Sequence, residues 1–170
     1  MAEKFIENLA DAEKILYTAD HMIYITFPLI NDKRLLLKII QEIKKSVINC
    51  ITSILHYEYA HRRVTLYKDP SLNFRIFSEK CAPSYNITKD EIRLILELFD
   101  FVEKHRESSF EFMRNDKVVI MSGNMRPKTL TIEKAKDFLI LGKNLLKKTR
   151  AKFFGKIFIV RFFVFIELCK

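Results

Sequence analysis

The chain has 170 residues, 49% of them hydrophobic and 30% charged, which is typical of one folded domain with its own core. Its net charge of +9 lies entirely in residues 126–170, which hold 12 Lys and Arg against 3 Asp and Glu. With only 3 Gly and 4 Pro, the sequence has too few turn residues for an all-β fold. It also lacks a glycine-rich loop for nucleotide phosphates.

The N-terminal segment is predicted to form an amphipathic helix. Its apolar residues recur at alternating steps of 4 and 3, at Phe5, Leu9, Ala12, Leu16, Ala19 and Ile23. Pro28 is expected to end this helix, because the residue before a proline is disfavoured in the α conformation.

A second helix is predicted from about Leu36 to about Lys68, where Asp69-Pro70 would stop it. Its apolar positions cover most of the helix surface from Ser46 to Tyr57, so we expect a central helix with neighbours on several sides. The residues expected to be almost fully buried are Ile43, Val47, Ile51 and Ile54.

Residues 71–81 are predicted to form a short helix that ends before Pro83. Thr88 and Glu91 have the spacing of a capping box, in which each side chain binds a free backbone N–H at the start of a helix. The helix that they open is expected to run to about Glu107.

The helical period is interrupted at about 110–131 and resumes near Ile132. We therefore predict an all-α fold, a bundle of four or five helices with one irregular or β-hairpin excursion at about 110–131. The predicted organisation is a helical bundle domain at 1–152, followed by a Phe-rich, basic and apolar tail at 153–170.

The tail has three interpretations. Residues 157–168 are almost wholly apolar but are interrupted by Arg161 and Glu167, and they are too short for a typical transmembrane helix. The first interpretation is an interfacial helix that contacts a membrane surface through residues 153–169. The second is a segment packed on the domain, and the third is an extension without a selected role. An A/T-rich genome would also favour its Phe, Ile and Lys codons.

Two groups of cations are candidate anion-binding residues. Arg62 and Arg63 follow one another near the end of the second helix, where they equally suit the negative end of the helix dipole. The other four are spaced by 7, 4 and 3 residues and so share one outer face of the last helix: Lys136, Lys143, Lys147 and Arg150. The alternative for both groups is a solvated surface.

The sequence contains no recognised catalytic motif, and we expect no cofactor and no metal. Glu58 and His61 have the ExxH spacing of di-iron bundle proteins, but no second such pair exists, so a surface Glu and His are the simpler interpretation. Cys50, Cys81 and Cys169 are isolated, which argues against a disulfide framework or a zinc site, and Cys50 is expected in the core.

The chain resembles a group of small uncharacterised archaeal helical proteins through the segments 66–70 (LYKDP), 79–88 (EKCAPSYNIT) and 103–122 (EKHRESSFEFMRNDKVVIMS). The similarity spans about residues 1–148, and the group implies no activity. More remotely, the helical layout is similar to HEPN-type bundles, which are often tied to RNA cleavage and commonly dimerise. The HEPN motif, an Arg followed by His four to six residues later, is absent, so no catalytic residue is transferred.

Together these features favour a non-enzymatic helical interaction module, associated with nucleic acid. The expected partners are a second copy of the chain in a homodimer and RNA or another anionic molecule. The alternatives are a HEPN-like module that binds or cleaves RNA and a peripheral membrane protein attached by the tail. The N-terminus lacks the order of a signal peptide, so a cytoplasmic location is expected.

Overall fold

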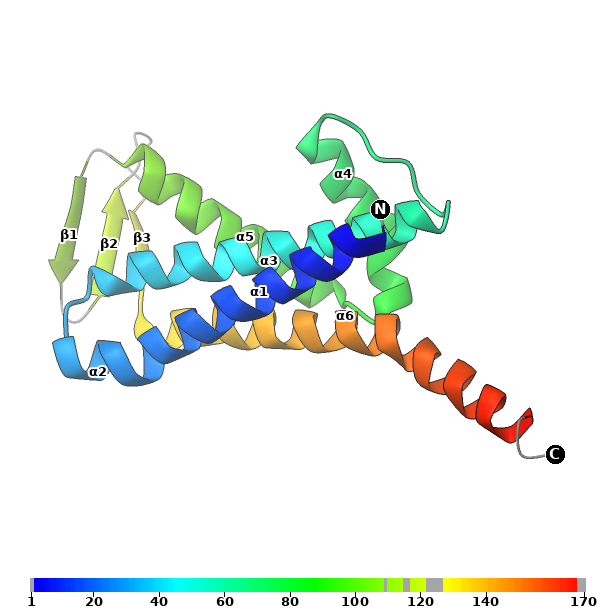
Figure 1. The fold of residues 1–170 in the computed structure, drawn as a ribbon. Coiled ribbons are helices and arrows are strands. Elements are labelled where there is room, and N and C mark those ends of the chain that lie inside the picture. The colour runs from blue at the N-terminus through cyan, green and yellow to red at the C-terminus, as the bar shows by residue number, and fades with distance from the viewer. Residues whose placement is uncertain (1, 109, 115–116, 122–126, 168–170) are drawn as a thin grey trace.

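The computed structural model describes residues 2–108, 110–114, 117–121 and 127–167, which are mostly helical. Within them the longest elements are α1 (Ala2–His21), α3 (Leu35–Ala60), α5 (Lys89–Glu107) and α6 (Ile132–Glu167). Figure 1 shows these helices running along a common body, with a small β-sheet at one end. The predicted all-α bundle with a β excursion is confirmed.

Helix α3 lies at the centre of the bundle and contacts α1, α5 and α6. Ile43, Val47 and Ile54 have no exposed surface, and Ile51 is only 6% exposed. The prediction of a central helix is therefore confirmed. Cys50 also lies in this core, as its position in the apolar stripe predicted.

Two buried serines fix how α3 packs on α1. The hydroxyl of Ser46 donates a hydrogen bond of 2.7 Å to the carbonyl of Ala12, and that of Ser53 donates one of 2.6 Å to the carbonyl of Phe5. The two bonds are seven residues apart on each helix, in opposite directions, so the helices are antiparallel. Serine is small enough to let the backbones approach, and its hydroxyl finds an acceptor there.

The expectation that Pro28 ends the first helix is wrong. The chain continues through a π-helical turn, η1 (Met22–Thr26), into the short helix α2 (Phe27–Ile30), and it turns away at Asn31 with φ of 53°. The N–H of Phe27 bonds to the carbonyl of Met22, five residues back. Proline lacks the N–H of an interior helical residue, and the wider turn before it accommodates that loss.

Helix α3 ends at Ala60, eight residues before the predicted stop at Lys68. Arg62 adopts the left-handed conformation with φ of 57°, and its N–H bonds to the carbonyl of Tyr59. The N–H of Arg63 bonds to the carbonyl of Glu58. This pair of bonds is a Schellman motif, which usually has glycine at the left-handed position, so an arginine there could not be recognised as a helix end.

Residues 70–85 form three short helical turns in succession: α4 (Pro70–Ile76), the π-helix η2 (Phe77–Cys81) and the 3₁₀-helix η3 (Ala82–Tyr85). The prediction of a helix over residues 71–81 is confirmed by α4 and η2, which together span Pro70–Cys81. Pro83 does not end the helical path, because proline fits the first turn of a helix and here lies in the first turn of η3. The capping box of Thr88 and Glu91 at the start of α5 is confirmed, with both of its hydrogen bonds present.

The excursion contains β1 (Phe110–Arg114), β2 (Lys117–Met121) and β3 (Pro127–Leu130). The described strands form one antiparallel sheet in the order β1-β2-β3, one strand more than a hairpin. Val118 and Ile120 of β2 and Leu130 of β3 are buried, so this sheet closes one end of the core.

Helix α6 runs through the predicted boundary at 152/153 without a break. The side chain of Phe153 is 3% exposed and packs on Phe5 and Tyr57, with ring centroids 5.2 and 4.3 Å away. Beyond this contact the backbone of α6 leaves the bundle (Figure 1). The tail side chains from Lys156 onward, and Cys169, lie outside the described residues.

Candidate functional site

Helices α1 and α6 lie against each other along much of their length. Gly142 of α6 faces Leu16 of α1, and a Cβ at position 142 would stand 2.8 Å from Leu16 Cδ1. The absence of a side chain on Gly142 therefore sets how closely the two helices approach. Their shared outer side is the candidate site, and we call it the α1–α6 face: Glu13, Tyr17, Asp20, Tyr24, Lys136, Ile140, Lys143, Lys147 and Arg150.

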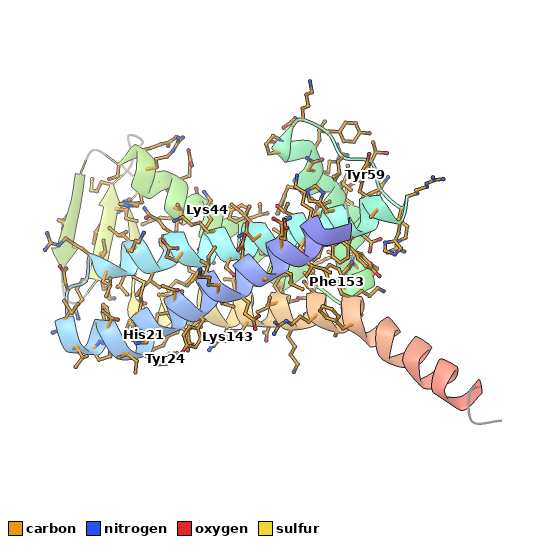
Figure 2. The ribbon with its side chains drawn as sticks, viewed as in Figure 1. His21, Tyr24, Lys44, Tyr59, Lys143 and Phe153 are labelled. Carbon is orange, nitrogen blue, oxygen red and sulfur yellow. The ribbon has the colours of Figure 1, made fainter. Side chains whose placement is uncertain are left out.

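An aromatic ring with two lysine side chains over it is the most distinctive feature of the α1–α6 face. Tyr24 lies in the π turn that follows α1 and is 50% exposed. The Nζ atoms of Lys136 and Lys143 lie 5.8 and 5.9 Å from the centre of its ring. Figure 2 shows Tyr24 and Lys143 at the same edge of the molecule. Tyr24 is thus half-exposed, and two positive charges lie close to its ring.

Two of the four predicted cations on α6 form ion pairs with α1. Lys143 binds Asp20, and Arg150 binds Glu13. Neither Lys136 nor Lys147 has an ion pair with any residue that the structure describes. The face therefore keeps a positive surplus. The sequence alone does not reveal the roles of Asp20 and Glu13, because the pairing depends on the register of α1 against α6.

Arg62 and Arg63 lie apart from the other four candidates, just after the end of α3. Arg63 Nη2 donates a hydrogen bond of 2.9 Å to Glu58 Oε1, and Arg63 Nε bonds to the second carboxylate oxygen. These bonds raise the pKa of Arg63 and engage its guanidinium in a fixed pair. The six candidates are thus two separate groups, and Arg63 already has an anionic partner within the chain.

The ExxH pair has a structural explanation. Glu58 is 5% exposed and its carboxylate binds Arg63 and Tyr85, so the interpretation of Glu58 as a surface residue is wrong. His61 Nδ1 lies 2.8 Å from the carbonyl oxygen of Tyr57, one turn earlier. In the described part of the chain no three His, Cys, Asp or Glu side chains come together as a metal-binding group would require.

Two buried thiols do not form a reactive centre. Burial raises the pKa of the Cys50 thiol to about 12 and that of the Cys81 thiol to about 11. Both groups therefore remain protonated at neutral pH, and only the thiolate is a good nucleophile. These cysteines contribute apolar volume to the core.

The α1–α6 face has the elements of a nucleic-acid contact. Exposed tyrosine rings can stack on bases, and lysine and arginine can bind phosphates. Tyr17 is 74% exposed and Ile140 is 52% exposed, which adds apolar surface beside Tyr24. Sequence analysis did not select these three residues, although Tyr17 and Tyr24 each follow a buried stripe position and so fall outside the stripe.

No protein family model, no curated protein and no solved structure matches the chain. Among the described helices, none combines the length and the apolar character needed to cross a bilayer.

Proposed function

We propose that this chain is a non-enzymatic helical interaction module that binds single-stranded nucleic acid, RNA above all, through the α1–α6 face. The observation that carries the proposal is the half-exposed ring of Tyr24 with Lys136 and Lys143 beside it. A base stacks on the ring while the neighbouring phosphates meet the lysines. Every base has such a face, so we expect little dependence on sequence.

The distribution of charge supports the same proposal. The +9 net charge comes from residues 126–170, and α6 carries most of those cations. Lys147 adds an exposed cation beside Ile140 on the same side of the helix. A phosphate backbone is a regular line of negative charge, and it complements a line of cations along one helix.

The test is binding of a fluorescein-labelled oligouridine 12-mer, measured by anisotropy over a range of salt concentrations. Contacts with several phosphates require that the logarithm of the association constant fall linearly with the logarithm of salt, by about 0.7 per phosphate for a single strand. Changing Lys136, Lys143, Lys147 and Arg150 to Gln is expected to abolish binding at low salt. Tyr24→Ala is expected to weaken binding at least fivefold, since stacking is worth about 1–3 kcal/mol per base.

A matched control removes the same charge from another surface. The control changes four exposed cations that lie on α4, η2 and α5 to Gln: Arg75, Lys80, Lys89 and Arg93. The proposal requires the control variant to bind nearly as well as the unchanged chain. Equal losses in the two variants, or no binding at low salt, would contradict it. A denaturing gel of the same RNA tests the HEPN-like alternative of cleavage, and ultracentrifugation tests the expected homodimer.

The end of α6 favours a second candidate, attachment to a membrane surface. Figure 1 shows α6 leaving the bundle, and this part of the sequence is rich in Phe, Ile and Val after a run of lysines. Such a helix suits the interface of an anionic bilayer. Flotation with phosphatidylserine vesicles, lost on deletion of residues 155–170, would support it, and the same recovery with and without this segment would argue against it.

A further inference from the structure

A groove lies on the side of α3 where α4 and α5 pack, separate from the α1–α6 face. It has a cavity of about 300 Å³ with apolar walls: Ile48, Ile51 and Leu55 of α3, Leu66 of the following loop, Phe74 of α4 and Phe99 of α5. We call it the α3–α5 groove. Its volume is at the lower end of the range for small-molecule sites, about 300–1,000 Å³.

The wall of the groove is held in place by its own hydrogen bonds. Asn73 of α4 accepts a bond of 2.9 Å from the N–H of Tyr67 and donates one of 2.8 Å to the carbonyl of Tyr67. These bonds fix the loop that carries Leu66. A ligand would therefore enter a site that is already formed, which lowers the entropy lost on binding.

One end of the groove is basic. Ile48 also lines an adjoining cavity of about 570 Å³, whose charged and titratable lining residues are Lys44, Lys45, His105 and Arg106. Lys45 and Arg106 have carboxylate partners on their own helices, Glu42 and Glu103. Lys44 has no ion pair with a described residue, and its Nζ lies 5.5 Å from the ring centre of Phe99, an apolar wall of the groove. Figure 2 labels Lys44 on α3.

The other end of the groove carries a histidine. His56 lines it, and burial, followed by the nearby Lys4, lowers the pKa of His56 below its ordinary value of 6.5. None of the described residues that line either cavity is an aspartate or a glutamate. The groove thus passes from an apolar channel to a cationic mouth.

We propose that the α3–α5 groove binds an amphipathic carboxylate, an alkyl chain of medium length with an anionic head group. The chain lies against Ile48, Phe74 and Phe99, and the head group meets Lys44 at the mouth. Burial of the alkyl chain against the apolar walls favours binding, and the positive charge of Lys44 favours an anionic head group over a cationic one. This site is independent of the proposed nucleic-acid face.

The probe is decanoate, titrated calorimetrically below the concentration at which it forms micelles. We expect one saturable site, with binding at least tenfold tighter than for decyltrimethylammonium, which has the same chain and the opposite charge. Butyrate has the same head group and too short a chain, so its binding is also expected to be at least tenfold weaker. Lys44→Gln is expected to weaken decanoate several-fold and to reduce its advantage over the cationic probe.

Ile48→Asp is the decisive variant, because Ile48 lines both cavities and, at 41% exposed, lies outside the fully buried core. It is expected to weaken decanoate at least tenfold, to lower the melting temperature no more than Leu96→Asp does, and to leave RNA binding unchanged. Leu96→Asp is the control, at a residue of α5 that is 49% exposed and lines neither cavity. Equal affinity for the two charged probes, equal loss in the two Asp variants, or no saturable binding would overturn the proposal.

Discussion

The phenol hydroxyl of Tyr85 donates a hydrogen bond of 2.8 Å to the carboxylate of Glu58, 27 residues earlier in the chain. Arg63 binds both oxygens of the same carboxylate. Glu58 lies in the last turns of α3, Arg63 just after it, and Tyr85 in η3. The buried carboxylate therefore holds three segments together, and its charge is satisfied by two donors.

Tyr85→Phe is expected to lower the free energy of unfolding by about 1–3 kcal/mol, because it removes one donor from a buried carboxylate and leaves no other group in its place. Urea denaturation at pH 7 measures the change. Tyr59→Phe is the control, since Tyr59 is 40% exposed. If Tyr85→Phe lowers the free energy of unfolding no more than Tyr59→Phe does, the hydrogen bond between Tyr85 and Glu58 does not stabilise the fold.

The contribution of Glu58 to stability depends on pH. Burial opposes its ionisation, but the hydrogen bonds from Arg63 and Tyr85 outweigh burial, and the pKa of Glu58 lies below its ordinary value of 4.5. A carboxyl with a depressed pKa in the folded state stabilises the fold fully above the pKa of the unfolded state, and this stabilisation is lost as pH falls through the folded value.

We therefore expect the unchanged chain to be more stable than Glu58→Gln at pH 7 and to lose this advantage progressively below pH 4.5. Glu79→Gln is a suitable control because the Glu79 side chain is 59% exposed. Unfolding free energies from urea titrations between pH 3 and pH 7 provide the measurement. A difference between the unchanged chain and Glu58→Gln that stayed constant, or that grew toward acid pH, would contradict this account.

Arg62 is the left-handed residue that ends α3, with φ of 57°. A side chain in this conformation costs about 1–2 kcal/mol, whereas glycine adopts it freely but loses more entropy on folding. Arg62→Gly is accordingly expected to stabilise the protein by about 0.5–1 kcal/mol. Arg62→Ala keeps the Cβ and should give no such gain. Thermal unfolding of the two variants distinguishes them, and equal melting temperatures would show that the left-handed turn carries no such cost.

Ile54 tests the central position of α3. Its side chain is fully buried, and Ile54→Ala is expected to cost about 2–5 kcal/mol through lost contacts and a residual cavity. Ile48→Ala on the same helix is the comparison, since Ile48 is 41% exposed and its truncation should cost less than about 1 kcal/mol. Chemical denaturation gives both values, and similar costs at the two positions would count against a core centred on α3.

Periodic patterns predicted the parts of this fold that repeat along the chain. The alternation of apolar residues identified the buried side of α3, and the capping box placed the start of α5, because both depend on residues within a few turns of each other. Helix ends were harder to place. Arg62 stops α3 where glycine would be usual, and Pro28 is accommodated by a wider turn, so neither residue acts as its type predicts.

The candidate site was predictable only in part. The spacing of Lys136, Lys143, Lys147 and Arg150 correctly placed them on one outer side of α6. The ring of Tyr24 and the carboxylate of Asp20 could not be predicted as parts of the same site, because they come from a segment more than 110 residues earlier in the chain. The α3–α5 groove could not be predicted from the sequence for the same reason, since residues of three helices and a loop line it.

The position at which α6 leaves the bundle leads to the last prediction. Phe153 is 3% exposed and contacts Phe5, Tyr57 and Tyr85, whereas Phe154 is 42% exposed and a Cβ at Gly155 would meet nothing within 4 Å. Deleting residues 155–170 is expected to leave the melting temperature nearly unchanged. Deleting residues 153–170 should lower it by roughly 10 °C, because losing a buried Phe costs about 3–5 kcal/mol.

Point variants separate the ring of Phe153 from the rest of the segment. Phe153→Ala in the full chain should reproduce most of the effect of the longer deletion, and Phe154→Ala should have little effect, since that ring is largely in solvent. Differential scanning calorimetry measures all four proteins. If deleting residues 155–170 destabilises the bundle as much as deleting residues 153–170, the segment beyond Phe154 packs on the body, and the membrane-surface candidate loses its support.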